Sequence, residues 1–192
     1  MMVKICGITN REDALAAVEA GASAIGFNFY RDSPRYISPT GAAMIAEKIP
    51  DAVWKVGVFV DEMPETIAKI ALDVGLDVAQ LHGLSEARGL RIWRAVAAGG
   101  PEPEQPTGAE ALLIDTPSQE LRGGTGNTWH WADARRYRGK IIIAGGLDAS
   151  NVRQAIEEAQ PWGVDACSRL EKFPGVKDHE KMKDFVKAAL SA

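Results

Sequence analysis

The sequence predicts a single-domain α/β protein in which eight parallel strands close into a (β/α)8 TIM barrel spanning residues 1–192. Short apolar runs alternate with segments of helical periodicity, a pattern typical of parallel strands joined by right-handed crossovers. Eight such runs follow one another at steady spacing. The first run lacks the GxGxxG turn of many doubly wound sheets. An open sheet of that kind remains the alternative, because 192 residues are few for a barrel.

The composition is that of one ordinary globular domain. Apolar residues make up 46% of the chain, which is enough for a sizeable core, and no linker divides the elements into two sets. The 26 acidic residues outnumber the 22 basic ones, which argues against a broad nucleic-acid interface. No apolar run has membrane-spanning length, the first ten residues lack a signal-peptide core, and two cysteines cannot build a disulfide framework. We therefore expect a cytoplasmic protein with neither a membrane nor a nucleic-acid partner.

The expected strands are short apolar runs that end at a glycine or a polar side chain. In chain order they cover residues 3–6, 24–29, 54–60, 77–83, 91–96, 111–115, 140–146 and 163–168. The expected helices begin at capping residues or prolines. Their starts, in chain order, are Thr9 or Asn10, Ser38-Pro39, Pro64, Ser85, a weak signal near 130, Asp148 and Asp178. Residues 97–110 interrupt the alternation, because their glycines and prolines exclude a normal helix. The fifth helix of the barrel is therefore expected to be absent or reduced.

Two residues at predicted strand ends are candidates for proton transfer, because a parallel barrel builds its active site where strands end. Cys6 ends the first strand, and a thiol there can act as a base if a nearby cation lowers its pKa; the alternative is a small buried core residue. Asp115 follows four apolar residues, where a carboxylate is costly to bury unless it is used or paired; the alternative is a loop cap. His82 is expected to be a hydrogen-bonded strand-end histidine, and Cys167 a core residue.

The loops after the seventh and eighth strands form the usual phosphate site of barrels. Gly145 and Gly146 permit close backbone approach, and Ser168 can donate to a phosphate oxygen, although the glycines could merely turn the chain. Arg35 lies in the loop after the second strand, where its guanidinium could bind a carboxylate through two hydrogen bonds. The alternative is a solvated surface residue. The glycine-rich segment 123–128 resembles a flexible lid over the mouth, or is an ordinary turn.

Eight motifs that appear in order along nearly the whole chain resemble those of the phosphoribosylanthranilate isomerase family. They are KICGIT (4–9), GASAIGFNFYRDSPRYIS (21–38), VGVFV (56–60), QLHG (80–83), LLID (112–115), GGTG (123–126), IAGGL (143–147) and PGVKD (174–178). The combination of KICG, SPRY and the two C-terminal motifs is highly specific, and residues 97–110 match least.

The resemblance implies a barrel with a reduced fifth helix and an enzyme of tryptophan biosynthesis. Its reaction would be the Amadori rearrangement of N-(5-phosphoribosyl)anthranilate to the 1-deoxyribulose 5-phosphate product, with no cofactor and no metal. By the family's motifs, Cys6 would be the general base and Asp115 the general acid, while Arg35 would contact the anthranilate carboxylate. The implied partner is a small phosphoribosyl substrate, bound by a monomer or a homodimer.

Arg169 departs from the family pattern. The family is expected to carry Ser-Ser-Gly-Val-Glu after the eighth strand, whereas this chain has Cys-Ser-Arg-Leu-Glu at 167–171. A side chain is unfavourable where the backbone must approach a phosphate closely, but the guanidinium could instead pair with that phosphate.

Three other functions remain as alternatives. One is a phosphate-binding barrel of different chemistry, such as a bifunctional sugar isomerase or a phosphopentose epimerase; Cys6 in place of an aspartate speaks against the dual-substrate isomerase. Another is an enzyme that uses Cys6 as a covalent nucleophile, for which His82 is the only candidate base. The last is a non-catalytic phosphoribosyl-binding protein, which Arg169 keeps open.

Overall fold

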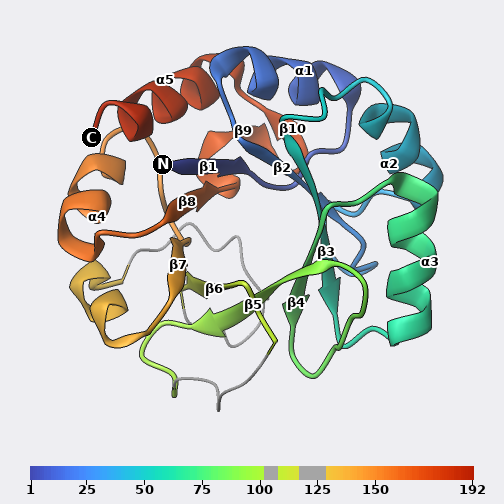
Figure 1. Ribbon diagram of the computed structural model, residues 1–192. Helices are drawn as coiled ribbons and strands as arrows, with labels where there is room; N and C mark the ends of the chain where they lie inside the picture. The colour runs from blue at the N-terminus through green and yellow to red at the C-terminus, as the bar shows by residue number, and fades with distance from the viewer. Residues whose placement is uncertain (102–107, 117–128) are drawn as a thin grey trace.

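Eight parallel strands close into a barrel in the computed structural model, which describes residues 1–101, 108–116 and 129–192 (Figure 1). Strand β1 pairs with β8 through the register Met2 to Gly163 and Ile5 to Ala166, so the first and last strands join. The barrel is therefore confirmed, and the open sheet is excluded. The strands are β1 Met2–Ile5, β2 Ala24–Asn28, β3 Trp54–Val60, β4 Val78–His82, β5 Arg91–Ala97, β6 Ala111–Asp115, β7 Lys140–Ile143 and β8 Gly163–Ala166.

Helices surround this barrel as an outer ring (Figure 1). The α-helices are α1 Arg11–Ala20, α2 Pro39–Ala46, α3 Pro64–Val74, α4 Val152–Ala159 and α5 His179–Leu190. Two 3-10 helices, η1 Trp131–Arg136 and η2 Ser168–Leu170, follow β6 and β8 in the chain. A small hairpin of β9 Glu171–Phe173 and β10 Val176–Lys177 then leads into α5. The weak helical signal near 130 thus corresponds to the 3-10 helix η1.

Three of the predicted helix starts, at Asn10, Ser38 and Asp178, are confirmed by side-chain caps. The Asn10 side chain accepts a hydrogen bond from the backbone N–H of Asp13, and Ser38 accepts one from Gly41. Asp148 is different. Its carboxylate accepts from the backbone N–H of Ser150 within a turn, and α4 begins only at Val152. The prediction that Asp148 caps this helix directly was therefore wrong.

The predicted short helix at Ser85 was also wrong, because the described residues between β4 and β5 contain no helix. The Ser85 hydroxyl accepts a hydrogen bond from the backbone N–H of Glu62, and its carbonyl accepts one from Arg94. These bonds hold the segment as a loop. The connection after β5 has no helix at 98–101 or 108–110, while 102–107 and the predicted lid 123–128 lie outside the described residues.

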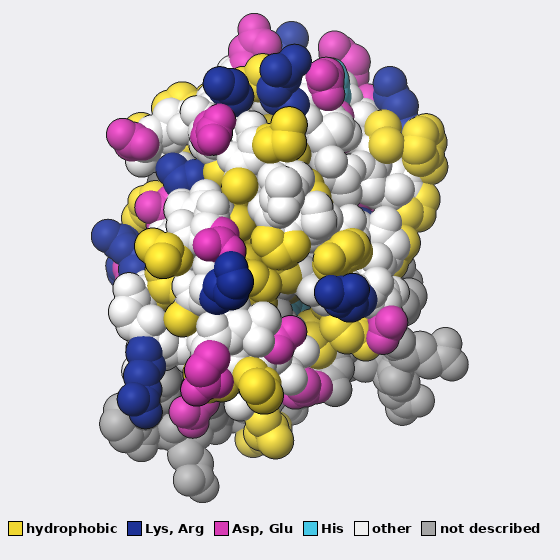
Figure 2. Space-filling view, turned by 90° about the vertical axis from the view of Figure 1, so that its right-hand side faces the viewer, with side chains coloured by type: hydrophobic (Ala, Val, Ile, Leu, Met, Phe, Trp, Pro, Cys, Tyr) yellow, Lys and Arg dark blue, Asp and Glu magenta, His cyan; other side chains and the backbone are white. Residues whose placement is uncertain are grey.

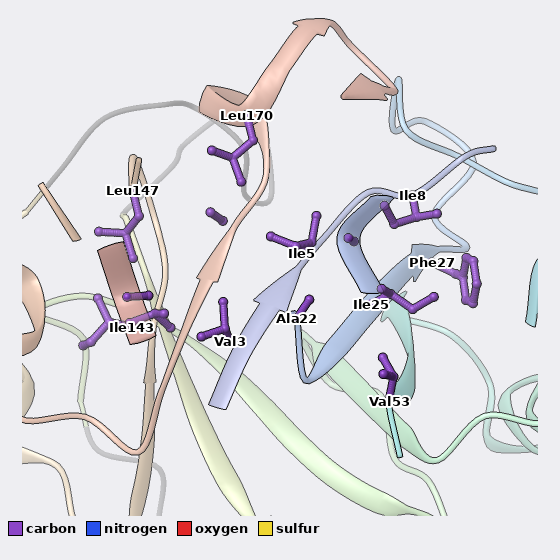
Figure 3. Close-up of a cluster of buried hydrophobic side chains, with 14 of the residues drawn as sticks. Val3, Ile5, Ile8, Ala22, Ile25, Phe27, Val53, Ile143, Leu147 and Leu170 are labelled. Carbon is purple, nitrogen blue, oxygen red and sulfur yellow. The ribbon is translucent and has the colours of Figure 1, made fainter. Parts of the chain in front are cut away.

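Alternating side chains separate the apolar interior into two layers. A large cluster lies between the strands and the helices and includes Val3, Ile5 and Ile25 (Figure 3). A smaller cluster inside the barrel includes Met2 and Leu113. Because strand side chains alternate between faces, every second residue after these two also points into the barrel. The same alternation directs Lys4 in β1, Cys6 directly after β1, and Asp115 at the end of β6 towards the inside of the barrel near its mouth.

Three tryptophans close the opposite, amino-terminal end of the barrel. The rings of Trp54, Trp93 and Trp162 lie 6.0 Å apart, centroid to centroid, in each pairing. The Arg91 guanidinium lies 4.6 Å from the Trp54 ring, and the Lys140 ammonium lies 4.7 Å from that of Trp162. This end is packed with aromatic and cationic groups, so the polar candidate residues face the other end.

The outer surface mixes charges of both signs. Figure 2 shows acidic and basic side chains interspersed with hydrophobic ones on the side of the molecule that carries α2 and α3. Among the described residues, no helix combines the length and the apolar character needed to cross a membrane.

Candidate active site

The seven residues singled out from the sequence all lie at or beyond the carboxyl ends of strands. Cys6 follows β1 directly and Asp115 ends β6. Gly145 and Gly146 follow β7, Ser168 and Arg169 form part of η2 after β8, and Arg35 lies in the loop after β2. Parallel strands bring these ends to one face of the barrel.

Cys6 lies beside a fully buried lysine that the sequence reasoning missed. Lys4 forms an ion pair with Asp165 on β8 at 2.9 Å, and its side chain also hydrogen-bonds to Cys6. Burial lowers the pKa of Lys4, but Asp165 and Cys6 outweigh it and raise that pKa, so the ammonium stays charged. A hydrogen bond from Cys167 and the positive charge of Lys4 overcome burial and hold the pKa of Cys6 well below its usual value. Cys6 is therefore suited to act as a thiolate base.

Gly26 on β2 provides the room for this cysteine and lysine. A Cβ atom placed on Gly26 would lie 2.9 Å from the Cys6 sulfur and 3.2 Å from the Lys4 nitrogen. We expect Gly26→Ala to cost about 1–3 kcal/mol of unfolding free energy, since overpacking forces buried neighbours to move. Urea unfolding would measure this cost. Gly41→Ala in the exposed first turn of α2 is the control, and an equal loss in both variants would contradict the expectation.

The pKa of Asp115 shifts in the opposite direction from that of Cys6. Burial raises the pKa of Asp115 to about 6, although the backbone N–H of Thr116 donates to its carboxylate at 2.7 Å. The negative charge on Cys6 raises it further. Gly145 has a φ of +89°, and a Cβ there would lie 2.8 Å from the Asp115 oxygen, so only glycine permits this approach. Asp115 can thus hold a proton at a pH at which an ordinary aspartate has lost it.

A polar pocket collects five of the seven predicted residues. Its lining includes Asp115, Gly145, Gly146, Ser168 and Arg169, together with Asp165 and Cys167. Cys6 does not line this pocket. It interacts with Cys167, which does line it. The guanidinium of Arg169 forms an ion pair with Asp148 at 2.7 Å. Because Cys167 lines this pocket, the expectation that it belongs to the core was wrong.

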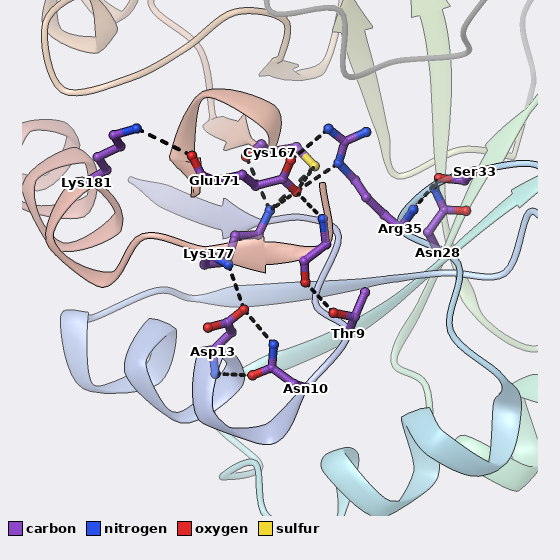
Figure 4. A network of polar contacts seen from close by, with 11 residues as sticks. Thr9, Asn10, Asp13, Asn28, Ser33, Arg35, Cys167, Glu171, Lys177 and Lys181 are labelled. Carbon is purple, nitrogen blue, oxygen red and sulfur yellow. Dashed lines mark hydrogen bonds and ion pairs between the residues drawn. The ribbon is translucent and has the colours of Figure 1, made fainter. Parts of the chain in front are cut away.

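Arg35 is not among the residues that line this pocket. Its guanidinium makes two hydrogen bonds, of 2.9 and 2.8 Å, to the carboxylate of Glu171 (Figure 4). The same carboxylate accepts a hydrogen bond from the ammonium of Lys177 at 2.9 Å. Burial raises the pKa of Glu171, but its bonds to Arg35 and Lys177 outweigh burial and lower it. Arg35 is thus held rigidly beside the mouth by an ionised partner.

Five charged or thiol residues at this end had no functional role predicted from the sequence: Lys4, Asp165, Cys167, Glu171 and Lys177. A signal existed for Lys4 and Asp165. Each is a charged residue within a short apolar strand, where burial is unfavourable without a partner. Glu171 and Lys177 gave no comparable signal, because their pairing depends on the β9–β10 hairpin.

Comparison with known proteins identifies the family. Residues 3–188 match the family model described as N-(5'-phosphoribosyl)anthranilate (PRA) isomerase. The chain belongs to the PRA isomerase family. The N-(5'-phosphoribosyl)anthranilate isomerase of Solibacter usitatus is 50% identical over 202 residues, which cover 100% of this chain and 98% of that protein.

Solved PRA isomerase structures share the fold. That of Thermus thermophilus superposes with a TM-score of 0.88 at 34% identity, covering 100% of this chain and 99% of that one. Another PRA isomerase, in complex with reduced 1-(o-carboxyphenylamino)-1-deoxyribulose 5-phosphate, gives a TM-score of 0.81 at 37% identity, with 100% of both chains covered. The resemblance inferred from the motifs is therefore confirmed at the level of the family.

Proposed function

We propose that this chain catalyses the isomerisation of its family, the Amadori rearrangement of N-(5-phosphoribosyl)anthranilate in tryptophan biosynthesis, with Cys6 as general base and Asp115 as general acid. The observation that carries the assignment is the pair of opposite pKa shifts at the strand ends. The pKa of the thiol is lowered, and burial raises that of the carboxyl to about 6. Two groups whose environments push their pKa values apart are suited to an acid and a base role.

The first step opens the ribose ring. Protonated Asp115 gives its proton to the ring oxygen as the bond from that oxygen to C1′ breaks. The anthranilate nitrogen lone pair forms the C1′=N bond, which gives a protonated Schiff base. The Asp115 carboxyl can serve as the acid because it lies in the wall of the pocket, where burial raises its pKa.

The second step removes the proton on C2′. The Cys6 thiolate takes this proton, and the C–H electron pair becomes a C1′=C2′ bond that neutralises the iminium. The resulting enolamine tautomerises to the ketone product. Lys4 and Cys167 support the thiolate before the step by their hydrogen bonds.

The substrate phosphate is proposed to bind the glycines after β7 and the start of η2. Gly145, Gly146, Ser168 and Arg169 line one pocket with Asp115, so a phosphate there would fix the ribose beside the acid. Arg169 already has Asp148 as an ionic partner, so its guanidinium either exchanges that partner for the phosphate or holds the loop in shape.

Arg35 is proposed to bind the anthranilate carboxylate while Glu171 holds its guanidinium in place through two hydrogen bonds. We expect Arg35→Lys to raise KM about tenfold with a smaller change in kcat. A lysine cannot make both the two hydrogen bonds to Glu171 and a directed hydrogen bond to the substrate carboxylate. Steady-state kinetics would measure the two constants. A change confined to kcat would contradict a binding role.

Turnover of freshly generated phosphoribosylanthranilate tests the proposed function directly. We expect the purified chain to remove the anthranilate-type fluorescence of the substrate in a saturable manner, with no added metal or cofactor. A chain that binds the reduced product analogue but does not turn over substrate would instead be a non-catalytic binder. We further propose a cytoplasmic location and a monomer or homodimer, which size-exclusion chromatography with light scattering would distinguish.

A further inference from the structure

The two cysteines of the chain lie beside each other at the mouth of the barrel. Cys6 and Cys167 are far apart in sequence and both are free thiols. The register of β1 and β8 pairs Ile5 with Ala166, and the backbone N–H of Cys6 donates to the carbonyl of Ala166 at 2.9 Å. Cys6 and Cys167, the next residues along these two paired strands, are therefore neighbours.

This arrangement matches the geometry that a disulfide needs. Neighbouring strands lie about 4.7–4.9 Å apart, which falls within the range of about 4.4–6.8 Å between the Cα atoms of bonded cysteines. The Cys6 side chain points to the inside of the barrel, because Met2, four residues earlier on alternate positions, does so. Cys167 lies two residues after Asp165, whose carboxylate pairs with Lys4 on the same inner face. Cys167 also lines the polar pocket, and 9% of the surface of Cys6 is exposed, so a small solute can reach the pair.

The two thiols differ in the way that a reactive and a resolving cysteine differ. Cys6 has the ammonium of Lys4 beside it, which favours the thiolate. The pKa of Cys167 is raised, so its thiol stays protonated; it donates to the Glu171 carboxylate at 3.9 Å, and the Lys177 ammonium lies 3.7 Å from its sulfur. That ammonium can stabilise the charge that develops on Cys167 when it loses its proton.

We propose that Cys6 and Cys167 form a reversible disulfide when the chain meets a peroxide, and that this bond takes the thiolate of Cys6 out of reach of the substrate. In the first step the Cys6 thiolate attacks hydrogen peroxide, which gives a sulfenic acid and hydroxide. In the second, the sulfur of Cys167 displaces the sulfenic OH group, which takes the Cys167 proton and leaves as water, while solvent neutralises the hydroxide from the first step. A thiol reductant reverses the bond by exchange.

Mass spectrometry of the full chain treated with hydrogen peroxide tests this proposal without relying on any activity. We expect the intact mass to fall by that of two hydrogen atoms and a peptide containing the Cys6–Cys167 bond to appear under non-reducing digestion. Activity, where measured, should fall in parallel and return on addition of dithiothreitol.

Two variants give matched controls. In Cys167→Ser no resolving thiol remains, so peroxide should drive Cys6 to sulfinic acid, and dithiothreitol should not restore the initial rate of that variant. In Cys6→Ser, Cys167 should stay alkylatable under the same treatment, because burial raises the pKa of its thiol and a protonated thiol reacts slowly with peroxide. A wild-type chain that acquires oxygen on Cys6 without the linked peptide, or that forms a disulfide between two chains, would overturn the proposal.

Discussion

Replacing Cys6 by serine is expected to lower kcat by about 10³-fold, since general base catalysis contributes about 10²–10⁴-fold. A serine hydroxyl is close in size to the thiol but does not ionise near neutral pH, so the Lys4 ammonium has no thiolate to stabilise. KM should change little, because the variant still binds the phosphate and carboxylate ends of the substrate. Stopped-flow or steady-state loss of substrate fluorescence would measure kcat.

Unfolding of the same variant in urea is the control for this result. Cys6→Ser should still unfold in one cooperative transition, losing only the stability that the lowered pKa of the thiol contributes, so that lost turnover cannot be attributed to an unfolded chain. A variant with kcat within threefold of the wild type would refute the base role of Cys6.

Replacing Asp115 by asparagine is expected to lower kcat by about 10³-fold and, at pH 7, to make the chain more stable. The carboxyl has a pKa of 3.8 when unperturbed and about 6 when folded, so at pH 7 folding must hold an ionised group in an unfavourable place. This difference corresponds to about 2–3 kcal/mol at 1.36 kcal/mol per unit of pKa. An asparagine oxygen can still accept the hydrogen bond from Thr116 without carrying a charge.

The sign of this effect sets its pH dependence. A carboxyl whose pKa is raised by folding costs stability fully above its folded pKa, and the cost disappears when both folded and unfolded states are protonated. The stability gain of Asp115→Asn should therefore be largest at pH 7 and above, shrink as the pH falls through 6, and vanish only below the unfolded pKa of 3.8. Urea unfolding across this range measures it. A gain that does not depend on pH would show that the carboxyl is not the cause.

The strands and the main site positions were predictable because they depend on local patterns. Apolar runs that end at a polar residue located Cys6 and Asp115 at the mouth, and glycine pairs located Gly145 and Gly146. Ser85 shows the limit of such patterns. A serine before charged residues is an ordinary helix start, but here its hydroxyl binds Glu62 from another loop.

The polar network behind the site was not predictable, because its partners lie far apart in the chain. Lys4 and Asp165 are separated by 161 positions, and Arg35 and Glu171 by 136. Contacts between residues so far apart leave no periodic pattern in a single sequence. Only the closed register of β1 on β8 and the β9–β10 hairpin bring these groups within hydrogen-bond distance.

The pairing of β1 with β8 also has a consequence for synthesis of the chain on the ribosome. Lys4 emerges 161 residues before its partner Asp165, which at about 5–20 residues per second corresponds to a wait of roughly ten to thirty seconds. During that interval the nascent chain has an unpaired β1 edge and a lysine without its carboxylate. Translation that stalls before Gly163 would leave this edge open to pairing with another chain, so Cys6 is synthesised among the first residues and is covered by β8 only near the end of synthesis.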